Sequence, residues 1–142
     1  MSVRHILDEK GRNVITVGPQ VTVREAATFL HDNHIGAVVV VDAKGGIAGI
    51  LTERDVVASV AKYGADCLDK SVSAVMWSNV YCCTEETSIN ALMEMMIKRR
   101  ARHLPVEKNG HLVGIVSIGD AVKNHIRAIE QEAEHIKAYI TG

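Results

Sequence analysis

The feature that most constrains the fold of this 142-residue chain is an internal repeat. The segment Gly49–Asp55 (GILTERD) recurs as Gly114–Asp120 (GIVSIGD), an offset of 65 residues (49→114). Upstream the offset becomes 66, because the turn at residues 42–45 corresponds to a turn one residue shorter at residues 108–110. Turns rich in Gly, Asn and Asp tolerate such a difference. The chain is therefore predicted to hold two copies of one unit.

Each copy is predicted to fold as strand, helix, strand, turn, strand and helix (βαββα). Thr22 and Glu25 match the capping pattern that opens a helix, and Thr52 begins a second helix. In the second copy Ser88 replaces Thr22 but lacks an acidic partner, so the reciprocal cap is lost. The expected strands are residues 14–17, 36–41 and 46–51 in the first copy, with residues 104–106 and 112–116 as the hairpin of the second.

Two such copies of about 60 residues are each marginal alone, because a sheet with helices on one face encloses little core. We therefore predict an α/β (α+β) fold in which the repeats pack face to face as a pseudo-two-fold pair. Residues 1–70 are assigned to the first repeat with an N-terminal lead-in. Residues 71–142 are assigned to the second repeat with an extended C-terminal helix, and together they form one module.

The last predicted helix carries an apolar row that continues past the second copy. Its residues are spaced 4, 3, 4, 3 and 4 apart, as in a heptad seam. Such a row needs a partner surface, so the helix either folds back on its own domain or packs against the same helix of a second subunit. We expect a homodimer. The row consists of Val122, Ile126, Ile129, Ala133, Ile136 and Ile140.

Composition disfavours several classes of protein. The 16 Lys and Arg nearly balance 17 Asp and Glu, for a net charge of −1, which argues against broad binding to nucleic acid or membrane. The longest apolar run, residues 35–41, is far shorter than the ~20 residues of a membrane helix, and the start lacks a signal-peptide core. The three cysteines form no Cys-x-x-Cys pair, so neither a disulfide nor a metal site is expected. We expect a cytoplasmic protein.

The repeated signature places a hydroxyl and a carboxylate three residues apart at a helix start, as Thr52 with Asp55 and as Ser117 with Asp120. From the residues alone, two interpretations stay open. The pair can cap the helix and suit its dipole. Alternatively, a fixed carboxylate can accept hydrogen bonds from a ribose diol, while the hydroxyl and free helix N–H groups suit a phosphate. Recurrence in register favours the second interpretation, because the residues in between diverge.

With this signature the chain resembles a tandem pair of cystathionine-β-synthase (CBS) domains, a Bateman module, over roughly residues 14–126. In that family the segment Gly, two apolar residues, Thr or Ser, and Asp three positions later closes an adenine nucleotide cleft. The resemblance implies that Asp55 and Asp120 contact ribose and that Thr52 and Ser117 lie near phosphate. It places adenine against the backbone of Ala37, Val38, Leu104 and Pro105.

Phosphate also needs cations, and the densest basic segment is residues 98–103. Arg grips phosphate with two parallel hydrogen bonds, and His adds a donor. In similar modules this segment borders the phosphate cleft, so we expect Arg100, Arg102 and His103 in the second site and Arg54 in the first. The alternative is that the start of this run merely solvates a helix end.

The two sites are not expected to be equal. The opening strand of the family carries a Thr, which is Thr16 in the first copy and Cys82 in the second, so the second site lacks this hydroxyl. The first copy has Ile, Gly and Ala at residues 35–37, where the second has Ala, Arg and His at residues 101–103. Its cleft is therefore more open but lacks cations from that loop.

The resemblance implies a regulatory module that binds AMP, ATP or NAD(H) and transmits a conformational change to a partner protein. Similar modules in inosine monophosphate dehydrogenase and in the γ subunit of AMP-activated kinase regulate a catalytic partner. No catalytic cofactor is expected. An enzyme is disfavoured, because the sequence offers no nucleophile–base pair and no phosphate-loop Lys. The alternative is a ligand-independent scaffold or dimerisation protein that acts through the C-terminal helix.

Overall fold

The computed structural model describes residues 1–141, which form two compact units. The repeat-1 unit comprises Asn13–Tyr81 with Lys108–Val113. The repeat-2 unit comprises Met1–Arg12, Cys82–Glu107 and the chain from Gly114 on. Residues 1–12, expected as a lead-in to the first repeat, thus group with the second, and a repeat boundary at residue 70 stays a prediction.

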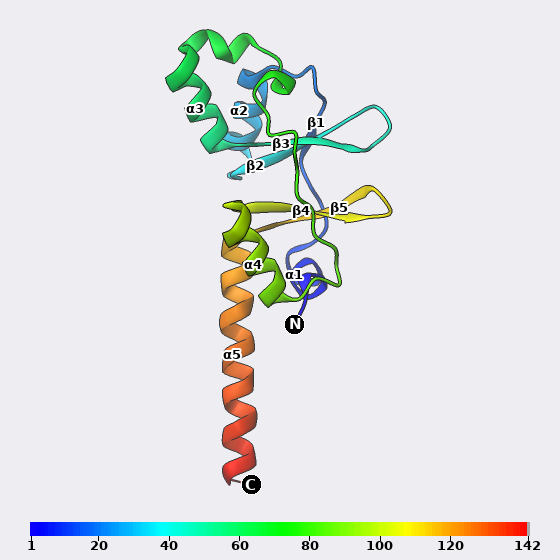
Figure 1. Ribbon diagram of the computed structural model, residues 1–142, viewed down its shortest axis with the longest axis vertical. Helices are drawn as coiled ribbons and strands as arrows, with labels where there is room; N and C mark the ends of the chain where they lie inside the picture. The colour runs from blue at the N-terminus through cyan, green and yellow to red at the C-terminus, as the bar shows by residue number, and fades with distance from the viewer. Residues whose placement is uncertain (142) are drawn as a thin grey trace. The chain divides into compact units, whose positions relative to one another are not determined.

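The repeat-1 unit follows the predicted βαββα order. The short strand β1 pairs in parallel with β2, and β2 pairs antiparallel with β3. Helices α2 and α3 lie on the same side of this sheet (Figure 1). Two short 3₁₀ helices, Ala65–Asp69 and Val72–Ala74, follow α3. The elements are β1 (Thr16–Val17), α2 (Val23–Asp32), β2 (Ala37–Val41), β3 (Ile47–Thr52) and α3 (Glu53–Tyr63).

The core of this unit lies between the sheet and its helices. Because β2 is buried along nearly its whole length, its sequence AVVVV shows no polar alternation. Helix α2 begins at the Thr22 cap, whose side chain accepts a hydrogen bond from the Glu25 N–H at 3.1 Å. The buried cluster consists of Val17, Ala26, Leu30, Val38, Val40, Leu51 and Val72.

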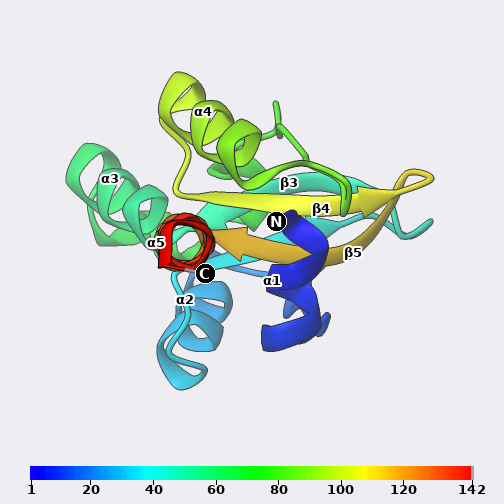
Figure 2. The same ribbon diagram turned by 90° about the horizontal axis from the view of Figure 1, so that it is seen from below.

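The repeat-2 unit contains a two-stranded sheet, β4 with β5, and three helices. In Figure 2, where α5 is seen end-on, β5 runs directly into that helix. Ser88 caps α4 by accepting a hydrogen bond from the Ala91 N–H at 3.1 Å, as expected from the sequence. The elements are α1 (Val3–Lys10), α4 (Ile89–Arg99), β4 (His103–Lys108), β5 (His111–Ser117) and α5 (Ile118–Thr141).

The opening strand expected in the second copy is reduced to one isolated bridge, between Cys83 and Val106. This bridge corresponds to the pair formed by Val17 and Val40 in the first copy, at the offset of 66 (17→83, 40→106). To extend the parallel ladder by one residue, position 105 would have to donate a backbone N–H. That position is proline, which has none.

Helix α1 was not expected from the sequence. Ser2 begins it, and Val3, Ile6 and Leu7 are at most 2% exposed. These positions, i, i+3 and i+4, lie on one helix face. Backbone hydrogen bonds from Val3 N–H to Thr87 O and from Ile89 N–H to Met1 O join the start of this helix to the start of α4.

Equivalent glycines admit close packing in the two repeats. A Cβ atom on Gly49 would lie 2.9 Å from the Trp77 carbonyl oxygen, and one on Gly114 would lie 2.8 Å from the Leu7 Cδ2 atom. Real Cβ atoms do not approach other atoms so closely. A side chain at Gly49 would therefore clash with the backbone of Trp77, and one at Gly114 would displace the buried Leu7 side chain.

Helix α5 has 24 residues, for a length of about 36 Å at 1.5 Å per residue. Figure 1 shows α4 beside its first part and the remainder extending beyond α4. In the extended part the predicted apolar row is uncovered within the chain: Ile129 is 52% exposed, Ile136 is 55% exposed and Ile140 is 75% exposed. No helix among residues 1–141 combines the length and apolar character needed to cross a bilayer.

Candidate functional site

The signature residues of the first repeat form a reciprocal cap at the start of α3. The Asp55 backbone N–H donates to Thr52 Oγ1 at 3.3 Å. In return, Asp55 Oδ2 accepts from the Thr52 backbone N–H at 2.9 Å and from the Thr52 hydroxyl at 3.0 Å. These bonds fix the orientation of the carboxylate and engage only Oδ2. Capping therefore leaves Oδ1 available as an acceptor, so the two interpretations of the signature are compatible.

The other residues predicted for the first site lie beside this cap. Ala37 is the register partner of Thr52 across the antiparallel pair β2–β3. The Glu53 N–H donates to the Gly36 carbonyl oxygen at 3.0 Å, which joins the start of α3 to the start of β2. The structure thus brings together the backbone position expected for adenine and the hydroxyl expected for phosphate.

Three further predicted residues flank that pair. Val38, next to Ala37, is fully buried, and its register partner in β3 is Leu51. Thr16 is exposed at the first position of β1, and its register partner in the parallel ladder is Val39. Arg54 is exposed in the first turn of α3.

The second repeat has the same reciprocal cap at the start of α5. The Asp120 N–H donates to Ser117 Oγ at 3.1 Å, and the Ser117 N–H donates to Asp120 Oδ2 at 2.9 Å. The Ile118 N–H donates to the Arg102 carbonyl oxygen at 2.8 Å, the counterpart of the bond from Glu53 to Gly36. Duplication therefore extends from the sequence to the hydrogen bonds that position each carboxylate.

Lys10, at the end of α1, also contacts the carboxylate of Asp120. This contact was not predicted from the sequence. The Lys10 Nζ atom donates to Asp120 Oδ2 at 2.7 Å and to the Ile115 carbonyl oxygen at 3.1 Å. Burial alone would raise the pKa of Asp120, but the hydrogen bonds from Lys10 and Ser117 and the charge of Lys10 lower it below the ordinary 3.8. The apolar spacing of Val3, Ile6 and Leu7 was the available signal for α1, but no local pattern links residues 10 and 120.

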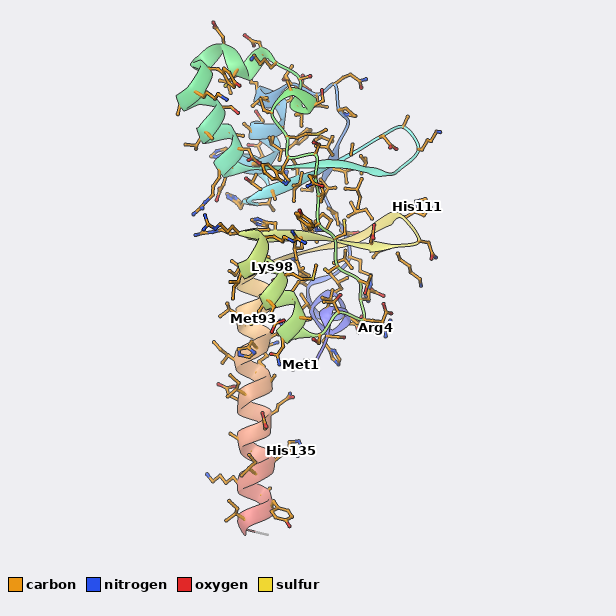
Figure 3. The ribbon with its side chains drawn as sticks, viewed as in Figure 1. Met1, Arg4, Met93, Lys98, His111 and His135 are labelled. Atoms are coloured by element: carbon orange, nitrogen blue, oxygen red, sulfur yellow. The ribbon has the colours of Figure 1, made fainter. Side chains whose placement is uncertain are left out.

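The basic segment of the second repeat lies between α4 and β4. Lys98 lies near the end of α4 that leads into β4 (Figure 3). Arg100 follows α4 with a left-handed backbone (φ 53°, ψ 35°), and its side chain is exposed. The equivalent His34 of the first repeat also has φ 53°, so this conformation belongs to the repeat rather than to the basic residues. Arg102 is exposed too, and its backbone reaches the start of α5.

The remaining residues predicted for the second site lie in strand β4 and in the segment that forms the isolated bridge with it. His103 is partly buried at the first position of β4, and Leu104 is 1% exposed. The Pro105 carbonyl oxygen accepts a hydrogen bond from the Cys83 N–H at 3.0 Å. Cys82, which replaces the hydroxyl of Thr16, is partly buried and precedes this bridge. The structure therefore groups the predicted residues of each site within one unit.

The cysteines of the second repeat are packing residues in this geometry. Burial, with the nearby Glu107 charge, raises the pKa of the Cys82 thiol to about 11. Burial, followed by the charge of Cys82, raises the pKa of Cys83 to about 12. Both thiols are therefore protonated at neutral pH. Over residues 1–141, no group of three or more His, Cys, Asp or Glu side chains is arranged to hold a metal ion.

Known proteins match this combination of repeat and fold. The chain matches the CBS domain family over residues 3–62 and 72–126, which together span most of its length. The fold and the paired signature define a tandem α/β module. The chain belongs to the CBS-domain family, and the resemblance inferred from the signature is confirmed.

Solved structures agree with this assignment. The CBS-domain protein ATU1752 from Agrobacterium tumefaciens is 54% identical, with a TM-score of 0.83 over 86% of this chain and 91% of its own. The protein PAE2072 from Pyrobaculum aerophilum, complexed with AMP, is 27% identical, with a TM-score of 0.76 over 84% and 89% of the two chains. The CBS domain pair of protein MJ0100, in complex with 5-methylthioadenosine and S-adenosyl-L-methionine, is 25% identical, with a TM-score of 0.79 over 88% and 95%.

Curated relatives are more varied in length. Eight of them are 28–35% identical to this chain. The chain spans 77% of the length of one of these relatives, 61% of another and 22% of a third. In the longer relatives the matched module is thus one part of a larger protein.

Proposed function

We propose that this chain is a regulatory module that binds an adenine nucleotide, AMP, ATP or NAD(H), with one adenosine site in each repeat. The observation that carries the proposal is the duplicated cap, in which Asp55 and Asp120 are each fixed by reciprocal bonds to the preceding hydroxyl residue. A carboxylate held in this way has an oxygen left to accept a hydrogen bond from a ribose diol.

The surroundings of each cap support an adenosine ligand. In both repeats, a backbone hydrogen bond holds the start of a strand beside the start of the signature helix, where adenine and phosphate are expected. Helix N-termini favour phosphate, because their first N–H groups lack intrahelical acceptors. The ligands of PAE2072 and MJ0100 all contain adenosine, which supports the same ligand class here.

The proposed activity is signalling rather than catalysis. The cap hydrogen bonds join only the signature residues to one another, and the sequence offers no nucleophile–base pair. A ligand that binds two arrangements of the module unequally shifts their populations, and a partner protein can respond to that shift. The partner in this proposal is a separate regulated protein, and the cytoplasm is the proposed location.

The exposed apolar row of α5 favours a second candidate function, dimerisation or scaffolding through that helix. Ile129, Ile136 and Ile140 are each more than half exposed, and a heptad row of this kind is covered when two helices pack. A homodimer is compatible with nucleotide sensing. A scaffold alone would dimerise and bind its partner without any ligand.

Isothermal titration calorimetry of the purified chain with AMP, ATP, NADH and S-adenosylmethionine, at one salt concentration and pH, tests the proposal. Micromolar binding of at least one compound is the expected result. An absence of binding for all four would contradict the nucleotide proposal and leave scaffolding through α5 as the better account.

A further inference from the structure

The two carboxylates of the duplicated signature differ in their charge environment. Asp120 forms an ion pair with Lys10, with 2.7 Å between Nζ and Oδ2. Among residues 1–141, Asp55 takes part in no ion pair, and its carboxylate is hydrogen-bonded by Thr52. The second carboxylate is therefore paired with a resident cation, whereas the first is paired with none among residues 1–141.

Lys10 is held in this position by the packing of α1 rather than by the ion pair alone. Leu7, one turn earlier, packs on Gly114 of β5, where an added Cβ would lie 2.8 Å from Leu7 Cδ2. On the same helix, the Glu9 carboxylate accepts a hydrogen bond from Arg127 of α5 at 2.5 Å. Figure 3 shows Arg4 on α1, and its guanidinium pairs with Glu86 at 2.7 Å. These contacts hold both ends of α1, and the Lys10 side chain extends from its last residue.

The geometry leaves hydrogen-bonding capacity on both members of the pair. An ammonium has three N–H donors, and Lys10 gives one to Asp120 and one to the Ile115 carbonyl oxygen. The hydrogen bonds that Asp120 accepts from Lys10 and Ser117 both end on Oδ2. A ligand can therefore accept from Lys10 and donate to Asp120 Oδ1 without breaking the ion pair.

We propose that Lys10 is a specificity-determining residue of the second site, which makes that site favour phosphate-bearing adenosine ligands over uncharged ones. This inference rests on the proposed nucleotide function. The Lys10 charge cancels the repulsion between Asp120 and a polyphosphate, and its third N–H is available to the ligand. The exposed Arg100 and Arg102 belong to the same unit and add positive charge to it. The first site, where no cation pairs with Asp55 among residues 1–141, discriminates less in favour of charged ligands.

The test compares adenosine with ATP in the full chain carrying Asp55→Ala, which isolates the second site. Titration calorimetry gives the ratio of the two affinities with Lys10 present and after Lys10→Met, which keeps the apolar stem and removes the charge. The ratio of ATP to adenosine affinity is expected to fall about three- to tenfold, the range for a partly exposed ion pair or charge-assisted hydrogen bond. Adenosine affinity is expected to change less than about twofold.

Two controls accompany this comparison. Lys44→Met removes one charge from an exposed turn of the repeat-1 unit and is expected to leave the ratio unchanged. Lys10→Arg keeps the charge and is expected to preserve the preference for ATP. If Lys10→Met does not fold, as judged by circular dichroism, Lys10→Gln replaces it, because glutamine retains a hydrogen-bond donor without the charge.

The outcomes separate this inference from the function on which it rests. An unchanged ratio in Lys10→Met, or an equal loss of adenosine and ATP affinity, overturns the role of Lys10 while leaving nucleotide binding intact. Failure of the Lys10-containing protein to bind either compound, with Asp55 present as well as absent, overturns this inference, and the nucleotide function falls with it only if AMP, NADH and S-adenosylmethionine also fail to bind.

Discussion

The Lys10 ammonium lies 2.7 Å from the Asp120 carboxylate, although the two residues are 110 positions apart in the chain. Asp120 belongs to the repeated signature, whereas Lys10 precedes the first repeat strand and has no counterpart in the bonds of Asp55. The internal repeat therefore yields two similar caps whose carboxylates differ in charge environment, because only Asp120 is paired with a cation. This difference affects both the stability of the repeat-2 unit and the ligands that its site is suited to bind.

The ion pair predicts a dependence of stability on acid pH. Because the folded-state pKa of Asp120 is below the ordinary 3.8, its contribution is present above that value and is lost as pH falls through the folded pKa. The unfolding free energy of the parent chain should therefore fall between about pH 6 and about pH 3. In Lys10→Met this fall should be smaller by about 0.5 kcal/mol, a small value because the ion pair is partly exposed. Urea unfolding at both pH values measures this change. An identical loss in both proteins would show that Lys10 does not hold Asp120 ionised.

The close packing of Leu7 on Gly114 predicts a position that is intolerant of any side chain. Gly114→Ala should lower the unfolding free energy by about 1–3 kcal/mol, because the new Cβ would lie 2.8 Å from Leu7 Cδ2. Gly18→Ala is the matched control, since no atom lies within 4 Å of its added Cβ. Urea denaturation of the two variants measures the difference. Equal stability of the variants would contradict the packing of α1 on β5.

The exposed row of α5 predicts a homodimer that depends on that helix. Ile129→Glu combined with Ile136→Glu should convert the dimer to monomer, because two charges would replace apolar contacts of the seam. Gln131→Glu with Ala138→Glu adds the same two charges at the same seven-residue spacing on the opposite face. Light scattering coupled to gel filtration gives the mass of each protein. A monomeric parent protein, or a dimer that survives the first pair of changes, would contradict the prediction.

The raised thiol pKa values predict slow cysteine chemistry in the second repeat. With a pKa of about 11, only about one Cys82 thiol in a thousand is ionised near pH 8. Iodoacetamide should therefore alkylate Cys82 about a hundredfold more slowly in the folded chain than in the same chain unfolded in urea. Mass spectrometry of the Cys82 peptide over time measures both rates. Comparable rates would show that the thiol is neither desolvated nor protected.

Comparison of the two repeats predicted the elements that recur. The expected strand 36–41 is observed as Ala37–Val41, and the caps at Thr22, Thr52 and Ser88 all form. These features depend on local patterns, such as apolar runs and hydroxyl residues before a helix, that are visible in a single sequence. The signature pairs were identified in the same way, which is why both predicted carboxylates lie at helix starts beside the predicted strands.

Features that depend on distant residues were not predicted. The isolated bridge at Cys83 replaces a strand because Pro105 lacks an N–H, a consequence that can be deduced from the sequence only once the register is known. Helix α1 has a local signal in Val3, Ile6 and Leu7, but its packing in the repeat-2 unit requires the tertiary structure. The Lys10 contact follows from that packing, so no reading of the repeats alone could supply it.

The central claim, that each repeat uses its carboxylate to bind adenosine, is tested most directly by titration calorimetry of AMP into four proteins: the parent chain, Asp55→Ala, Asp120→Ala and the double variant. Each single change should remove one AMP site or weaken AMP binding there by about 1.5–3 kcal/mol, the value of a charge-assisted hydrogen bond. The double variant should bind AMP tightly at neither site. Undiminished stoichiometry and affinity in a folded double variant would contradict the claim.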